Sequence, residues 1–128
     1  MSAVAVIPAF NEEASLGGVL AEIAEIDGLV PVVVDDGSSD GTAGVARNAG
    51  VACVRLPFNL GVGGAVRTGL RWALDHDADT VVIVDADGQH DPADVAALLA
   101  AIDAGAGLAI GSRFAAGAGD YTCLLYTN

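Results

Sequence analysis

The sequence predicts an α/β fold in which helices cover a mostly parallel central sheet. Five short apolar runs, of the kind that forms buried strands, alternate with segments in which apolar residues recur at helical spacing. The links between them are short and contain Gly, Asp, Asn and Pro, as turns do. Right-handed crossovers then place the carboxyl ends of the parallel strands at one edge of the sheet.

The first expected strand covers residues 3–8 and ends at Pro8, because proline cannot donate a hydrogen bond to a central ladder. We expect Asn11 to cap the helix that follows and Gly28 to lie just beyond its end. The apolar positions of this helix are Leu16, Val19, Leu20, Ile23 and Ile26.

A second strand is expected over residues 30–34, followed by the acidic loop 35–42, whose Ser and Asp side chains can cap a helix that runs to about Asn48. A third strand is expected over 51–56. The glycine-rich link 57–64 then leads into a helix with one apolar face. That face is expected to carry Val66, Leu70, Ala73 and Leu74.

The fourth expected strand, residues 81–84, runs directly into the sequence Asp-Ala-Asp-Gly-Gln. Asp91 and Pro92 form an N-cap and N1 pair for the next helix, and a short fifth strand is expected over 108–111. The buried stripe of that helix is expected to consist of Val95, Leu98, Leu99 and Ile102.

Carboxylates at the end of the fourth strand predict a metal site. Asp85 and Asp87 are one residue apart and would project to the same side of an extended chain. With the Gln89 carbonyl they offer the hard oxygen ligands that Mg²⁺ or Mn²⁺ prefers, and such ions complete their shells with substrate phosphates. The alternative is that these residues only form a turn and cap a helix.

A second acidic pair, Asp35 and Asp36, ends the second strand and is expected at the same edge of the sheet. A carboxylate there can accept a hydrogen bond from a base or from a ribose hydroxyl, so the pair predicts nucleoside recognition. The alternative is again a turn without a ligand.

Several polar or glycine-rich features leave two interpretations open. The Gly-rich stretch 61–64 could present a helix N-terminus to a phosphate or could serve close packing, and it lacks a full dinucleotide-binding fingerprint. His90 is a candidate base only because it lies beside the acidic cluster. Arg113 could pair with a substrate phosphate or form a surface ion pair. His76 and the arginines of the third helix are expected at the surface.

Composition limits the class of protein. The chain has 128 residues, which suits one domain, and its net charge of −12 excludes a binder of nucleic-acid backbones. No apolar run approaches the roughly 20 residues of a transmembrane helix, and no basic segment precedes the first strand. These features predict a cytoplasmic protein.

Four blocks of sequence, taken together, resemble family 2 glycosyltransferases of the GT-A fold. The blocks are VIPAFNEE (6–13), VVDDGSSDGT (33–42), NLGVGGA (59–65) and DADGQHDP (85–92). Within that family, the fourth block followed by IGSRF (110–114) is most similar to the dolichyl- or undecaprenyl-phosphate sugar transferases. The resemblance implies a Rossmann-like three-layer sandwich that is incomplete at its C-terminus.

The resemblance also implies roles for individual residues. The nucleotide pocket would be formed by Pro8, Phe10, Glu12, Asp35, Asp36 and Asp85, with Asp35 in an assisting position. The metal ligands would be Asp85, Asp87 and Gln89. The catalytic residues would be Asp85, Asp87 and Arg113, with Arg113 on the acceptor loop.

The implied reaction moves a sugar from a GDP- or UDP-linked donor to a polyprenyl phosphate, with inversion at the anomeric carbon and with Mg²⁺ or Mn²⁺ offsetting the charge of the leaving diphosphate. A saccharide hydroxyl is the alternative acceptor. Two other hypotheses are a donor-binding fragment without turnover and a nucleotidyltransferase, although the loop after the first strand lacks the basic, glycine-rich character of the latter.

Members of the family normally continue beyond this length, so we expect a C-terminally truncated chain. Residues 1–120 are expected to form the donor-binding part of the domain, and residues 121–128 an atypical tail that is non-native or disordered. A peripheral contact with the inner face of the membrane would then depend on the missing part.

Overall fold

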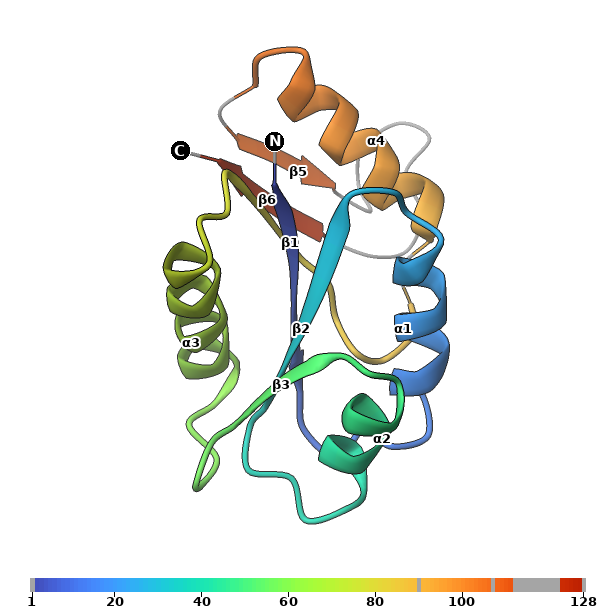
Figure 1. The fold of residues 1–128 in the computed structure, drawn as a ribbon, viewed down its shortest axis with the longest axis vertical. Coiled ribbons are helices and arrows are strands. Elements are labelled where there is room, and N and C mark those ends of the chain that lie inside the picture. Colours follow the sequence, from blue (N-terminus) through green and yellow to red (C-terminus); the bar gives the residue numbers. More distant parts are fainter. Residues whose placement is uncertain (1, 90, 107, 112–122, 128) are drawn as a thin grey trace.

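The computed structural model describes residues 2–89, 91–106, 108–111 and 123–127, and these form a three-layer α/β/α sandwich (Figure 1). The sheet has six strands in the order β3-β2-β1-β4-β6-β5. Their bounds are β1 Ala3–Ala9, β2 Leu29–Asp35, β3 Ala52–Arg55, β4 Thr80–Ile83, β5 Leu108–Gly111 and β6 Cys123–Thr127. Strands β1 to β4 pair in parallel, whereas β6 is antiparallel to both β4 and β5. The predicted mostly parallel sheet is therefore confirmed.

Four helices cover the two faces of this sheet. Helix α3 lies on one face, and α1, α2 and α4 lie on the other (Figure 1). Their bounds are α1 Leu16–Ala24, α2 Thr42–Asn48, α3 Val62–Asp75 and α4 Pro92–Asp103. Alternate residues of β1 supply the two cores: Ile7 packs with α1 and α4, and Val6 packs under α3, each with no exposed surface.

The predicted buried face of α3 is wrong in part. Ala65, Gly69 and Ala73 are the buried residues of this helix, whereas Leu74 is 57% exposed. The reason is a close approach to the sheet, since a Cβ atom placed on Gly69 would lie 2.2 Å from Cγ1 of Val6. Small residues therefore lie closest to β1, Leu70 packs against the edge of this core, and Leu74 faces away from it.

The predicted N-cap of α1 is also wrong. The helix begins at Leu16 with Ser15 at the N-cap position, and Asn11 lies in the preceding loop with φ of 53°. Asn11 is instead bonded to the loop after β2, because its Oδ1 accepts a hydrogen bond from the backbone N–H of Ser39 at 2.9 Å. The expected apolar stripe is confirmed in Leu16, Val19, Leu20 and Ile23.

Other local predictions are confirmed. Asp91 caps α4 by accepting a hydrogen bond from the N–H of Ala93 at 2.9 Å, with Pro92 at the start of the helix. Val95, Leu98 and Ile102 of that helix are buried, and Leu99 is partly buried. Strand β5 occupies the residues expected for the fifth strand.

Part of the predicted tail belongs to the sheet. Residues 123–127 form β6, whose backbone pairs with β4 on one side and with β5 on the other. The division at residue 120 and the description of the tail as non-native or disordered stay predictions. Within the described residues, no helix has the length and apolar character needed to cross a membrane.

Candidate functional site: a pocket at the carboxyl edge of the sheet

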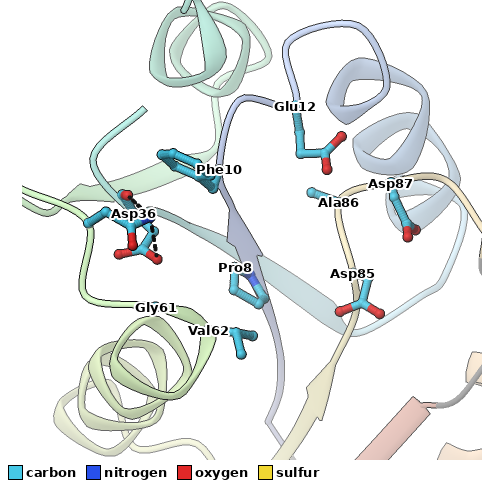
Figure 2. Close-up of a pocket in the computed structure, with 10 residues that line it drawn as sticks. Pro8, Phe10, Glu12, Asp36, Gly61, Val62, Asp85, Ala86 and Asp87 are labelled. Carbon is cyan, nitrogen blue, oxygen red and sulfur yellow. Dashed lines mark hydrogen bonds between the residues drawn. The ribbon is translucent and has the colours of Figure 1, made fainter. Parts of the chain in front are cut away.

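A pocket of about 490 Å³ lies at the carboxyl edge of the parallel strands (Figure 2). The ends of β1, β2 and β4 and the start of α3 contribute to it. Its lining residues are Pro8, Phe10, Glu12, Asp36, Asn59, Gly61, Val62, Asp85, Ala86 and Asp87. The fold thus brings six of the predicted site residues to one cavity, namely Pro8, Phe10, Glu12, Asp36, Asp85 and Asp87.

Asp36 is held in place by the loop between β3 and α3. Its Oδ1 accepts a hydrogen bond from the N–H of Leu60 at 2.7 Å, and its Oδ2 accepts one from Nδ2 of Asn59 at 3.2 Å (Figure 2). The same amide also donates to the backbone carbonyl of Asp36 at 3.1 Å. The side chain is 3% exposed, so these bonds offset the cost of burying a carboxylate and fix its direction.

Gly37 allows the loops after β2 and β3 to approach this closely. It has φ of 73°, and a Cβ atom added there would lie 2.6 Å from the backbone N of Asn59 and 2.6 Å from the carbonyl carbon of Phe58. A glycine is therefore required by both the backbone conformation and the available space.

Asp35 does not line the pocket. It is 1% exposed, its Oδ1 accepts a hydrogen bond from the N–H of Ser38 at 3.0 Å, and its Oδ2 lies 3.6 Å from Nε of Arg55. That Oδ2 has no hydrogen-bond partner among the described residues, so the ion pair with Arg55 is its main compensation. Asp35 also contributes, after burial itself, to the raised pKa of the neighbouring Cys53 thiol. Its bonds indicate that it shapes the loop, and its predicted assisting role at the nucleoside stays a prediction.

The loop that carries Phe10 and Glu12 is bonded to the loop after β2. The N–H of Asn11 donates to Oγ of Ser38 at 2.9 Å, and the N–H of Glu12 donates to Oγ1 of Thr42 at 3.0 Å. The backbone at residues 11 and 12 is thus attached to the loop after β2 without a ligand, which preorganises this side of the pocket.

A second set of bonds extends the same junction. Glu13 accepts a hydrogen bond from the N–H of Gly41 at 2.9 Å, and its own N–H donates to Asp40 at 3.3 Å. The Thr42 side chain hydrogen bonds to Asp40, which lowers the pKa of that carboxyl below its ordinary value of 3.8. Asp40 therefore acts as a structural anion at the loop junction.

The Asp-Ala-Asp turn lies just beyond β4. Asp85 and Asp87 are exposed, and Figure 2 shows both carboxylates pointing the same way from the turn, although the strand has already ended at Ile83. The N–H of Gln89 donates to Oδ1 of Asp87 at 3.0 Å, whereas the Gln89 side chain is exposed and does not line the pocket. The structure places the two carboxylates together at the cavity and leaves Gln89 at its edge.

The charge of the pocket fits a divalent cation bound with a diphosphate. Glu12, Asp36, Asp85 and Asp87 are acidic, and no described lining residue is basic. A diphosphate would be repelled by this set unless a cation bridged it to the carboxylates, and two carboxylates are the number that Mg²⁺ uses when phosphates and waters supply the rest. The described residues contain no cluster of three or more His, Cys, Asp or Glu side chains able to enclose a metal alone.

The N-terminus of α3 also faces the pocket. Gly61, with φ of 88°, is its N-cap, and Gly61 and Val62 both line the cavity. The unpaired N–H groups and the dipole at the start of a helix favour a phosphate. The sequence left this role open against close packing, and both interpretations stay open: Gly61 and Val62 line the pocket, whereas a Cβ atom added to Gly64 would lie 2.7 Å from Cβ of Leu60.

Four lining residues carried no individual role in the sequence-based prediction. They are Asn59, Gly61, Val62 and Ala86, and Asn59 is the one whose side chain has a specific polar function. Its place at the start of the block NLGVGGA (59–65) is a signal in the sequence, but the partner carboxylate lies 23 residues earlier in the chain.

Some predicted residues are placed elsewhere or are not described. His90 and Arg113 lie outside the described residues, so their predicted roles stay predictions. His76 is exposed, as expected, and its ring stacks on Trp72 with a centroid distance of 3.7 Å. Arg67 and Arg71 lie on the exposed side of α3, also as expected.

Comparison with known proteins agrees with this geometry. Residues 4–128 match the model of glycosyl transferase family 2. The chain is 37% identical over 119 residues to the polyprenol monophosphomannose synthase of Mycolicibacterium smegmatis, covering 88% of this chain and 45% of that protein. It is also 37% identical over 122 residues to the undecaprenyl-phosphate mannosyltransferase of Micrococcus luteus, covering 88% and 49% respectively.

A solved structure shares the fold. Glucosyl-3-phosphoglycerate synthase from Mycobacterium tuberculosis, in complex with Mn²⁺, UDP-glucose and phosphoglyceric acid, superimposes with a TM-score of 0.69 at 31% identity, over 85% of this chain and 42% of that one. The expected GT-A fold is thereby confirmed. The chain spans about half the length of the curated relatives that it matches. On the family match and these relatives together, the chain belongs to glycosyl transferase family 2.

Proposed function

We propose that the pocket binds a nucleoside-diphosphate sugar and that the chain supplies the donor side of an inverting, metal-dependent glycosyltransferase. The observation that carries this proposal is the convergence of Asp36, Asp85 and Asp87 with the N-terminus of α3 around one cavity. These groups suit the three parts of such a donor: the base, the cation-bound diphosphate and the phosphate oxygens.

The nucleoside would occupy the side of the pocket formed by Pro8, Phe10 and Asp36. Phe10 is 48% exposed and offers apolar area for a base. Asp36 presents a carboxylate whose direction is fixed by Asn59 and by the N–H of Leu60, and it would accept a hydrogen bond from the base or the ribose.

The diphosphate would extend toward the Asp-Ala-Asp turn. Asp85 and Asp87 would hold Mg²⁺ or Mn²⁺, with Gln89 beside them, and such a cation would offset the negative charge that develops on the leaving diphosphate. The first N–H groups of α3 would stabilise phosphate oxygens from the other side of the cavity.

We propose a polyprenyl phosphate as acceptor, because two of the relatives are named for mannose transfer to polyprenol or undecaprenyl phosphate. A phosphate acceptor is ionised at neutral pH, so its oxygen could attack the anomeric carbon without a dedicated base. Arg113 would pair with that phosphate. The reaction would take place in the cytoplasm, at the inner face of the membrane.

The donor is proposed to be UDP- or GDP-linked, and calorimetric titration tests this directly. UDP-glucose and GDP-mannose are titrated into the chain with MnCl₂ and with EDTA. We expect one of them to bind with Mn²⁺ and to lose that metal-dependent binding in Asp87→Ala. Asp27→Ala is the matched control, since Asp27 is an exposed aspartate at the end of α1, away from the cavity.

Two outcomes would separate donor binding from the complete reaction. Absence of metal-dependent binding for either sugar nucleotide would contradict the proposed donor site. Binding without transfer of labelled sugar to a polyprenyl phosphate would restrict this chain to donor binding, as expected if the acceptor side lies in the part of the relatives that it does not match.

A further inference from the structure

Ser15 occupies the N-cap position of α1 but does not cap the helix. A serine there normally accepts a hydrogen bond from an N–H in the first turn, and the side chain of Ser15 makes no such bond. The hydroxyl is directed instead to a loop 71 residues later in the chain. Because the Ser15 hydroxyl bonds to this distant loop and not to the first turn of α1, we infer that its role is other than starting the helix.

The Ser15 hydroxyl joins two walls of the pocket. Its Oγ lies 2.6 Å from the backbone carbonyl oxygen of Ala86 and 2.9 Å from Oε2 of Glu12. A hydroxyl has one hydrogen, so it donates to one of these two acceptors at a time. Figure 2 shows the Glu12 carboxylate extending toward Ala86, which is the geometry that this shared contact requires.

Ala86 is the residue between the two carboxylates of the Asp-Ala-Asp turn. Its side chain is 3% exposed and packs in the core with α1 and α4, while Asp85 and Asp87 on either side are exposed. The methyl group and the carbonyl oxygen of Ala86 therefore both attach the turn to the body of the domain near α1. Loss of the second point would leave the carboxylates less well oriented.

We propose that Ser15 is a positioning residue that fixes the Asp-Ala-Asp turn in the direction needed to hold a divalent cation. Its contact with Glu12 links this turn to the nucleoside side of the pocket. The ordering of the turn follows from the contacts of Ser15 itself, and its consequence for metal binding rests on the proposed function.

The first test measures order in the turn without metal or nucleotide. Backbone ¹⁵N relaxation is recorded for the wild type, Ser15→Ala and Ser15→Thr. In Ser15→Ala we expect the order parameters of the amides of residues 86–89 to fall from about 0.85 to below about 0.6, and in Ser15→Thr, which keeps the hydroxyl, we expect values near those of the wild type. Unchanged values in Ser15→Ala would overturn the proposal.

Ser2→Ala is the matched control for this experiment. The Ser2 hydroxyl also donates to a distant loop carbonyl, that of Asp77, at 2.7 Å, but at the amino end of β1 and far along the strand from the pocket. It removes a hydrogen bond of the same kind, so we expect no change at residues 86–89. A similar loss of order in both variants would show a general destabilisation and would also overturn the proposal.

The second test measures the increase in nucleotide affinity that Mn²⁺ produces, using UDP or GDP, whichever the wild type binds more tightly. We expect Ser15→Ala to reduce this increase roughly two- to tenfold, the range for one hydrogen bond, with recovery in Ser15→Thr. An unchanged increase in Ser15→Ala would refute the link to the metal. A wild type that gains no affinity from Mn²⁺ would contradict the proposed donor site, while the relaxation test still decides whether Ser15 orders the turn.

Discussion

The replacement Gly37→Ala should destabilise the fold and weaken nucleotide binding together. Gly37 lies where the loops after β2 and β3 meet, at φ of 73°, and its added Cβ would lie 2.6 Å from backbone atoms of Phe58 and Asn59. Because these are backbone atoms, the contact cannot be relieved by a rotation of a side chain. The loop that holds Asp36 would have to move.

The expected loss of unfolding free energy in Gly37→Ala has two parts, and a second variant can separate them. A non-glycine residue in the left-handed region costs roughly 1–2 kcal/mol, and a contact that forces a backbone shift costs about 1–3 kcal/mol more. Gly50, which follows α2, has the same φ of 73° but nothing within 4 Å of an added Cβ. Gly50→Ala should therefore show only the first cost.

Urea unfolding of the wild type and both variants measures the difference. We expect Gly37→Ala to lose about 1–3 kcal/mol more than Gly50→Ala, and to bind the nucleotide more weakly while Gly50→Ala binds it normally. Equal losses of unfolding free energy in the two variants would refute the close approach of the loops at Gly37.

Three further predictions use the same assays. Gly69→Ala should cost about 1–3 kcal/mol of unfolding free energy, because its Cβ would overlap Val6 in the closely packed contact between α3 and β1; a stabilised variant would contradict that packing. Asp36→Ala should abolish nucleotide binding with EDTA as well as with Mn²⁺, since it removes the contact to the nucleoside, and retained binding in calorimetry would place the nucleoside elsewhere. The hydrogen bond from the Thr42 side chain lowers the pKa of Asp40 in the folded chain. The ionised Asp40 therefore contributes to stability above pH 3.8, its ordinary pKa, and this contribution is lost as the pH falls through the lower pKa of the folded state. Asp40→Asn should flatten that part of the acid unfolding curve, and an unaltered curve would count against the hydrogen bond.

The layer order and the acidic edge could be predicted from the sequence because they depend on local patterns. Apolar runs set β1, β2 and β4, and parallel pairing then brings Asp36, Asp85 and Asp87 to one edge. The cap at Asp91 was predictable for the same reason, since an N-cap bond joins residues two positions apart.

The features that the sequence did not predict depend on contacts between distant segments. Asn11 has the composition of an N-cap, but its side chain bonds to Ser39, 28 residues later, and the helix starts further on. Asp35 and Asp36 are adjacent, yet Asp35 pairs with Arg55 while Asp36 is held at the pocket by Asn59 and Leu60, and both sets of partners lie about 20 residues later in the chain.

The buried face of α3 also depends on a contact between distant segments of the chain. A count of apolar residues at helical spacing selects Leu74, whereas the close approach of the helix to Val6 selects Gly69. The distance between a helix and the sheet is set by both partners, and the sequence of the helix alone does not contain it.

Asp85 and Asp87 are proposed to bind a divalent cation together with a nucleoside diphosphate. The paramagnetism of Mn²⁺ can show where that cation binds. Substoichiometric Mn²⁺ is added to ¹⁵N-labelled chain with and without UDP or GDP, and the broadening of each amide signal is measured. We expect the nucleotide to concentrate the broadening at residues 85–88 and at Gly61 and Val62. Broadening centred on the exposed aspartates of residues 75–79, or unchanged by either nucleotide, would contradict this expectation.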